Sequence, residues 1–229
     1  MPNTHSKRNV SSRVAYDHGM PSARAPNPNR RSERSRLAVL SACAELVTEV
    51  GFARLTVEAI AARAGVGKQT IYRWWPSKGA VVFDALLEMN RADGELGLPD
   101  TGNLGDDLRL VVRAMVSDLT DPRTDAVYRA VFAEIQSDER LAAELTERLM
   151  SPLTSALEAR LAAGRETGEV GPLVDLSVGL ELIVGPVFHR WLLRTGPLDE
   201  AYADTLVNTI VRALEPRDRD LPGWRTVPE

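Results

Sequence analysis

Residues 68–73 concentrate side chains that can donate hydrogen bonds to an anionic or polar surface. Amide and guanidinium groups pair with base edges in the DNA major groove, whereas carboxylates are repelled by the flanking phosphates. No acidic residue interrupts the segment, and contact with a nucleic acid is therefore the chemistry that it predicts. The alternative is an ordinary solvated helix surface. The donors are Lys68, Gln69, Thr70, Tyr72 and Arg73.

The neighbours of this segment predict two helices joined by a tight turn. Ile71 and Trp75 are four residues apart, so on a helix they share an apolar face that can pack on Ile60. Thr56 is placed to cap the preceding helix, and Gly65 can adopt the positive φ that a short turn between helices requires. The second helix then presents its polar face outward, which is how a recognition helix enters a DNA groove.

Charge is divided unevenly along the chain. Residues 1–79 hold 13 Lys and Arg against 5 Asp and Glu, while residues 80–229 hold 15 against 27. This asymmetry indicates that the first part meets a polyanion, with a random basic tail as the alternative. Residues 1–31 are rich in Pro, Ser and Asn and predict a disordered basic arm. We expect Arg30 and Arg31, at its end, to contact DNA.

The rest of the chain shows apolar residues at helical spacing and no alternating run long enough for a strand. The sequence therefore predicts an all-α protein of about nine helices, in which an N-terminal three-helix helix-turn-helix domain precedes a larger helical domain. The expected boundaries are 32–93 for the DNA-binding domain, with its motif at about 56–75, then 106–215 for the larger domain and 216–229 for a polar tail.

Several other classes of protein are disfavoured. Cys43 is the single cysteine and His189 stands alone, so we expect neither a disulfide within the chain nor a metal site. Phosphate loops, nucleophile–base pairs and dinucleotide signatures are missing, so we expect no catalytic residue, no cofactor and no enzymatic activity. The stretch 173–188 contains Asp175 and Glu181, which favours a buried helix over a membrane span. Without a secretory signal, a cytoplasmic protein is expected.

The string TVEAIAARAGVGKQTIYRWWPSK, residues 56–78, resembles the signature of the TetR family of bacterial transcriptional regulators. The capping Thr, the Ala-Gly-Val turn, the Thr-x-Tyr pair and the trailing Ser-Lys stand at the family's spacing, within a match over roughly residues 32–90. Gly67 departs from the family's usual Ser, and Gly79 from its frequent Glu. By position, the resemblance implies groove contacts by Lys68, Gln69, Thr70 and Arg73, and phosphate contacts by Thr56, Tyr72 and Lys78. Trp74 is an ambiguous candidate for stacking at the DNA backbone.

The resemblance also implies that the larger domain binds a small molecule and forms a homodimer. The predicted helix at about 173–194 is apolar almost all round, so it must be covered on more than one side, and a partner subunit could supply that cover. The candidates for the dimer interface are Leu182, Val187, Trp191, Leu206 and Ile210. The candidates for an effector pocket are Met115, Tyr128, Phe132, Met150, Phe188, His189 and Trp191.

The leading hypothesis is a sequence-specific transcriptional regulator, a dimeric repressor that binds a near-palindromic operator in double-stranded DNA and is released by a small-molecule effector. The sequence does not separate repression from activation. The alternative from another class is a helical small-molecule-binding protein or enzyme with an incidental basic arm. That alternative needs a catalytic constellation, which the sequence lacks.

Overall fold

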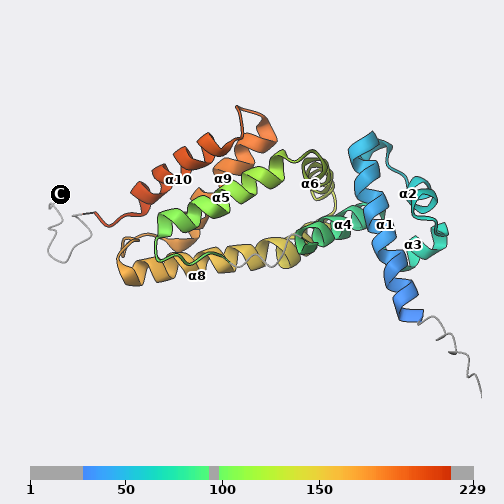
Figure 1. Cartoon of the computed structure of the whole chain (residues 1–229), viewed down its shortest axis with the longest axis horizontal. Helices are drawn as coiled ribbons and strands as arrows, with labels where there is room; N and C mark the ends of the chain where they lie inside the picture. The colour runs from blue at the N-terminus through green and yellow to red at the C-terminus, as the bar shows by residue number, and fades with distance from the viewer. Residues whose placement is uncertain (1–27, 93–97, 218–229) are drawn as a thin grey trace, which may run out of the picture.

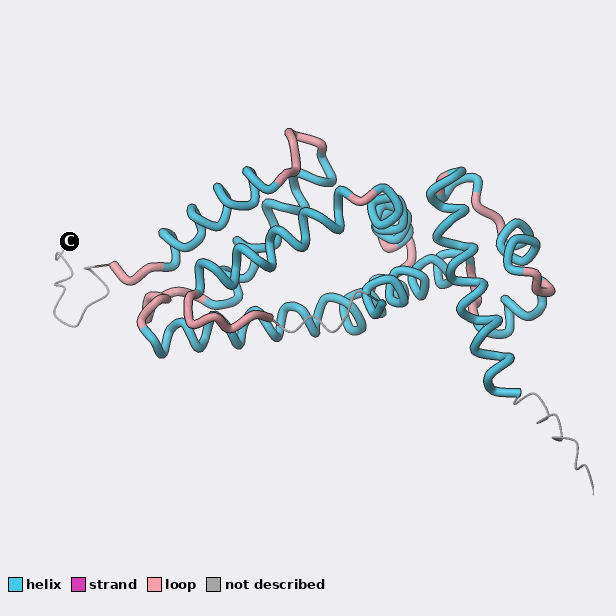
Figure 2. The backbone as a smooth tube through the Cα atoms, viewed as in Figure 1, coloured by secondary structure: helices cyan, strands magenta, loops and turns pink. Residues whose placement is uncertain are grey.

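The computed structural model describes residues 28–92 and 98–217, and all regular structure within these ranges is helical (Figure 2). The predicted all-α class is confirmed. In chain order the elements are α1 (Pro28–Val50), the 3-10 turn η1 (Phe52–Arg54), α2 (Val57–Ala64), α3 (Lys68–Trp74), α4 (Lys78–Ala92), α5 (Leu104–Thr120), α6 (Pro122–Glu134), α7 (Glu139–Leu145), η2 (Thr146–Met150), α8 (Ser151–Thr167), α9 (Leu176–Leu193) and α10 (Glu200–Leu214).

Helix α1 begins at Pro28, four residues before residue 32, where the DNA-binding domain was expected to begin. Proline suits the first turn of a helix because its missing N–H would have no partner there. Arg30 and Arg31 therefore belong to α1, which corrects the expectation that they end a disordered arm. The remainder of the predicted arm, residues 1–27, lies outside the described residues.

Helix α1 buries a wide apolar face. Val39, Cys43 and Val47 are all 2% exposed or less, and the helix packs against α2, α4 and α6. Burial raises the pKa of the Cys43 thiol to about 12, so this cysteine stays protonated and behaves as a small core residue. Helix α1 thus joins the N-terminal helices to the rest of the molecule.

The molecule is elongated, with α1, α2 and α3 at one end and α5, α8, α9 and α10 extending toward the other (Figure 1). Helix α4 connects the two parts and packs against α6 and α7 as well as α1. Helix α5 packs on α10, and α8 packs on α9. The polar helix α3 therefore lies far from the long C-terminal helices.

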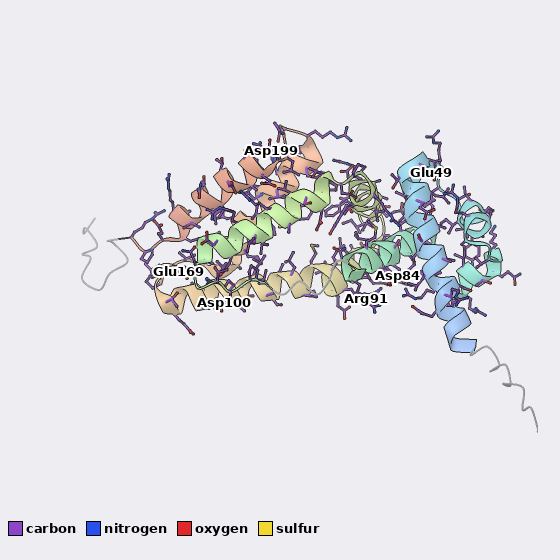
Figure 3. All side chains as sticks on the ribbon, in the orientation of Figure 1. Glu49, Asp84, Arg91, Asp100, Glu169 and Asp199 are labelled. Atoms are coloured by element: carbon purple, nitrogen blue, oxygen red, sulfur yellow. The ribbon has the colours of Figure 1, made fainter. Side chains whose placement is uncertain are left out.

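A buried ion pair links α5 to α8 at the end of the molecule that lies farthest from α3. Asp107 on α5 is 1% exposed, and Arg160 of α8 donates from Nε to its Oδ2 at 2.7 Å. Thr101 donates to Oδ1 from its backbone nitrogen at 2.9 Å and from Oγ1 at 2.7 Å. Glu169, labelled at this end in Figure 3, accepts from the backbone nitrogen of Leu104 at 2.7 Å. The cluster ties α5 to α8.

We expect Asp107→Asn to lower the free energy of unfolding at pH 7 by about 3 kcal/mol, because it removes the nearer of the two carboxylates that pair with the buried Arg160 guanidinium. Burial alone would raise the pKa of Asp107, but the hydrogen bonds from Thr101 and the ion pair with Arg160 outweigh it and lower the pKa. The stabilisation is therefore complete above the unfolded pKa of about 3.9 and disappears as the pH falls through the lower folded value.

Urea unfolding at pH 7 and at lower pH, at one protein concentration, measures this effect. Asp106→Asn is the matched control, since the Asp106 side chain is 62% exposed and pairs with Arg109 at the surface. We expect that control to change stability by less than about 1 kcal/mol. An Asp107→Asn deficit that stayed constant down to about pH 2 would show that the ion pair is not its cause.

Candidate nucleic-acid interface

The residues that begin α2 and that connect it to α3 adopt the predicted cap and turn conformations. The Thr56 hydroxyl accepts from the backbone nitrogen of Ala59 at 3.1 Å and so caps α2. Gly65 ends α2 with φ of 66°, a left-handed conformation that favours glycine. Gly67 precedes α3 and makes no side-chain cap, as expected for a position where the family usually has Ser. Local residue chemistry therefore sets the angle at which α3 leaves α2.

The inner side of α3 is anchored in the core. Ile60 and Ile71 are fully buried and Trp75 is 3% exposed, which confirms the predicted packing of these three residues. The Trp75 indole N–H donates to Asp84 Oδ2 at 2.8 Å. Trp74 is half-buried and meets Trp75 edge to face, with ring centroids 5.3 Å apart. The inner side of α3 is therefore packed in the core, and its outer side is exposed to solvent.

The outer side of α3 presents the predicted donors. Lys68, Gln69, Tyr72 and Arg73 are exposed, and Thr70 is half-buried. The Arg73 guanidinium lies 5.4 Å from the centre of the Trp74 ring. No acidic residue occurs on α3 itself, so its outer face is suited to approach phosphates and base edges.

One acidic residue reaches this face from α2, which the linear sequence did not indicate. The Lys68 ammonium pairs with the carboxylate of Glu58 and hydrogen-bonds to it. The hydrogen bond from Lys68 is the main cause that lowers the pKa of Glu58, followed by a backbone hydrogen bond, and the charge of Lys68 contributes less. Both side chains are well exposed, so the pair is weak and can be exchanged for a phosphate.

The structure gives Lys78 an intramolecular role. Its ammonium donates to the carbonyl oxygens of Phe52 at 3.1 Å and Leu55 at 3.4 Å, and it lies 4.2 Å from the centre of the Phe52 ring. These contacts hold the chain that enters α2 against the start of α4. Lys78 was predicted to contact phosphate, and its donors are here directed at the protein.

We expect Lys78→Met to lower the free energy of unfolding by about 1–2 kcal/mol, because two carbonyl oxygens lose a charged donor. Chemical denaturation measures this, and Lys68→Met, which removes an ammonium paired at the surface, is the matched control. We also expect Lys78→Met to leave the salt dependence of DNA binding unchanged. A decrease of about one in the slope of log affinity against log salt would instead assign Lys78 to a phosphate.

Gly79, the second departure from the family pattern, is explained by its neighbour. A Cβ atom at Gly79 would lie 2.8 Å from Oε2 of Glu134, which comes from α6. The carboxylate of Glu134 therefore lies next to the position where the family often has its own acidic side chain. This close approach lets α6 pack tightly against the start of α4.

A small cavity of about 60 Å³ lies among α4, α5, α6, η2, α8 and α9. Four predicted pocket residues, Met115, Tyr128, Met150 and Phe188, line it. Drug-sized ligands occupy roughly 300–1,000 Å³, so a ligand of that size must push these helices apart. Burial raises the pKa of Tyr128, which keeps its hydroxyl neutral.

The other predicted pocket residues lie elsewhere. Phe132 and Trp191 pack behind the cavity, where the Phe132 ring stacks on Phe188 with centroids 5.4 Å apart and Trp191 meets Phe132 at 5.5 Å. His189 is exposed and is not among the lining residues.

Sequence reasoning missed several residues of the cavity wall. Asn90 is the clearest case, since it stands four residues after the fully buried Leu86 and is therefore a polar residue on the inner face of α4. That spacing was the available signal. The other missed lining residues include Asp118, Leu149 and Leu153.

Helix α9 leaves an apolar stripe exposed, defined here as Val178, Leu182, Gly185, His189 and Leu192. Three of these side chains are 50%, 43% and 52% exposed, in the order Val178, Leu182 and Leu192, and open space surrounds Gly185. The spacing places all five on one face of the helix. The helix is long and apolar enough to cross a membrane by length and composition, and 22% of it is buried in the single chain.

Three predicted interface residues lie in the core of the chain itself. Val187 is fully buried, and Trp191 and Ile210 are each 4% exposed. They face the chain's own helices and have no surface to offer a partner, which corrects their assignment to a dimer interface. Leu206 is half-buried, and Leu182 belongs to the exposed α9 stripe.

These features define the class of the protein. A short helix that has an anchored inner side and contains no acidic residue follows another helix through a left-handed glycine turn. This arrangement is a helix-turn-helix whose second helix is suited to a DNA groove. The chain is a helix-turn-helix DNA-binding protein.

Comparison with known proteins identifies the family. Residues 39–85 match the model described as bacterial regulatory proteins, tetR family, and residues 98–210 match the model described as Tetracyclin repressor-like, C-terminal domain. The protein belongs to the TetR family of bacterial transcriptional regulators.

Individual relatives agree over most of the chain. YdeS, an uncharacterized HTH-type transcriptional regulator of Bacillus subtilis, is 34% identical over 185 residues, which span 81% of this chain and 92% of that protein. A DNA-binding transcriptional repressor of Mycobacteroides abscessus is 28% identical over 80% of this chain and 95% of its own length. The crystal structure of a TetR family transcription regulator aligns with a TM-score of 0.63 and 32% identity, over 80% of this chain and 100% of that chain.

Proposed function

We propose that this regulator is a homodimeric repressor that binds a near-palindromic operator and leaves it when a small molecule enlarges the cavity behind α4. The observation that carries the proposal is the exposed outer face of α3, which has no acidic residue of its own and lies opposite the buried Ile71 and Trp75. In this proposal residues 28–92 form the DNA-binding unit, and residues 98–217, together with Asn90 of α4, bind the effector, while residues 98–217 also bind the second subunit.

We assign the contacts by exposure and chemistry. Gln69 and Arg73 read base edges, because both are exposed and both carry groups that can bond bases in pairs. Lys68 also contacts base edges, after its ammonium leaves the ion pair with Glu58 and binds DNA instead. Tyr72 and the exposed cap residue Thr56 contact phosphates, with Trp74 supporting Arg73. The assignment of Thr70 to the groove and of Arg30 and Arg31 to the DNA backbone remains a prediction.

Dimerisation is supported by the α9 stripe. One recognition helix reads only a few base pairs, so two copies related by a two-fold axis are needed for a specific site. An apolar stripe with an open glycine at its middle allows two α9 helices to approach closely. A second copy on this face, with Leu206 at its edge, also explains why α9 is apolar without requiring a membrane.

The effector is a mainly apolar small molecule. Met115, Leu153 and Phe188 line the cavity, and the Tyr128 hydroxyl and Asn90 offer polar groups to orient a ligand. Such a ligand binds an expanded form of the protein better than the compact form, so it shifts the population away from DNA. Among the described residues no group of three His, Cys, Asp or Glu could hold a metal ion. We infer a cytoplasmic regulator without enzymatic activity.

The test is selection of duplexes from a random library by the full-length protein, followed by affinity measurements at several salt concentrations. We expect a near-palindromic consensus and an affinity that falls steeply with salt. Recovery of no enriched sequence, together with equal affinity for all duplexes, would refute specific DNA binding by this chain. The selected duplex is called the operator below.

A further inference from the structure

The two carboxylate oxygens of Asp84 contact different parts of the molecule. Asp84 lies on α4, at the junction between the N-terminal helices and the remainder (Figure 3). Its Oδ2 accepts from the Trp75 indole N–H at 2.8 Å. Its Oδ1 lies 3.1 Å from Nη2 of Arg148, which belongs to η2. One side chain therefore connects the end of the recognition helix to a segment far along the chain.

On the DNA-binding side, Asp84 holds the residue that ends α3. Trp75 is the C-cap of that helix, and its backbone N–H donates to the carbonyl oxygen of Ile71. The indole is 3% exposed, so its N–H depends on Asp84 for a partner. A change at Asp84 therefore alters how the C-terminal end of α3 is held against the core, on the side of the helix opposite its outer face.

On the effector side, Arg148 does not line the cavity but directly precedes two residues of η2 that do. Its two neighbours in η2, Leu149 and Met150, line the cavity. The guanidinium also lies 3.5 Å from a carboxylate oxygen of Glu144 and 5.3 Å from the centre of the buried Phe83 ring. These contacts give Arg148 a defined position although its side chain is 46% exposed.

The backbone of η2 adds a reason why this segment can move. It is a π-helical turn, in which each hydrogen bond spans five residues, between α7 and α8. Single π-turns within helices occur frequently at functional sites, because a return to α-helical bonding rotates the residues around them. Such a rotation at η2 would move Met150 and Arg148 together.

We propose that Asp84 is a positioning residue for the recognition helix and that its pair with Arg148 transmits displacement of the cavity wall to Trp75. The proposal rests on the proposed function, since it concerns how the same cavity governs DNA binding. A ligand that displaces Leu149 and Met150 withdraws Arg148 from Asp84. The carboxylate then loses one of its two partners, and the end of α3 becomes less well fixed.

The first test needs neither ligand nor DNA. The Trp75 indole resonance is recorded by ¹H–¹⁵N NMR in the full-length protein and assigned with a Trp75→Phe variant. We expect Arg148→Met to shift this resonance and to accelerate its hydrogen exchange, because Asp84 contacts both Arg148 and Trp75. Arg140→Met is the matched control, because Arg140 also pairs with Glu144, at 3.0 Å. An unchanged Trp75 resonance in Arg148→Met would overturn the proposal.

The second test measures operator affinity. We expect Arg148→Met to weaken binding about threefold to tenfold, and Arg140→Met to leave it unchanged. Asp84→Ala should weaken binding further, and Asp84→Asn, which keeps an oxygen for the indole, should restore part of the loss. Equal losses in Arg148→Met and Arg140→Met would refute a specific link through Asp84.

The third test is a double-mutant cycle that combines a cavity-filling substitution with Arg148→Met. Leu153→Trp enlarges a lining residue and should weaken operator binding in the otherwise unchanged protein, but have less effect in the Arg148→Met background. Identical effects in both backgrounds would exclude transmission through Arg148. If the unchanged protein binds no specific duplex, the proposed function fails while the NMR experiment still decides whether Arg148 and Trp75 are connected.

Discussion

Replacing Gln69 with alanine is expected to lower affinity for the operator about tenfold to a hundredfold while changing affinity for random duplexes by less than about twofold. The amide can bond two atoms of one base, so its loss removes sequence discrimination but leaves the phosphate contacts in place. Gln69 is exposed on the outer face of α3, and its truncation should not disturb the core.

Competition binding against the operator and a scrambled duplex measures this ratio. Gln136→Ala is the matched control, since Gln136 is an exposed amide beyond the end of α6, where it donates to the carbonyl oxygen of Phe132 at 3.3 Å. If Gln69→Ala weakened both duplexes equally, Gln69 would be a backbone contact. A repeat of the selection with the variant should also show relaxed preference at one base pair of each half-site.

Leu182→Arg is expected to convert the proposed homodimer to monomers and to reduce operator affinity by more than about a hundredfold. Leu182 belongs to the α9 stripe and lies one turn before the central Gly185, so two-fold symmetry would bring two added charges into one apolar interface. Monomers then bind each half-site separately and lose the gain from simultaneous contact.

Sedimentation velocity combined with operator binding tests this expectation. Leu110→Arg on α5 is the matched control, because Leu110 is 53% exposed, more than Leu182 at 43%, and lies outside the α9 stripe. We expect that variant to remain dimeric. A Leu182→Arg protein that sedimented as an unchanged dimer would place the interface on another surface.

Local chemistry made the DNA-binding motif predictable from the sequence. The cap at Thr56, the left-handed turn at Gly65 and the burial of Ile71 depend on residue type and on neighbours a few positions away. The start of α1 was less predictable, because a proline followed by polar residues is compatible with an arm or with a first helical turn. Its position at Pro28 brings Arg30 into the helix.

The cavity and the exposed stripe of the larger helical domain could be predicted less well than the DNA-binding motif. Helix α9 is apolar on nearly every side, so periodicity did not separate Val187, which faces the core, from Leu182, which faces outward. The π-turn η2 has no recognisable sequence signature, and the cavity that it lines depends on helices from several parts of the chain.

The sequence by itself determined the donor-rich helix of residues 68–73, its turn and its apolar anchor, because these follow from side-chain chemistry at short spacing. Only the tertiary structure decided what the charged groups around that helix contact. It paired Lys68 with Glu58, directed Lys78 at backbone carbonyls, and placed Asp84 between Trp75 and Arg148. Electrostatic and hydrogen-bonding partners are selected by distance in space, and distances between helices are set by how the whole core packs.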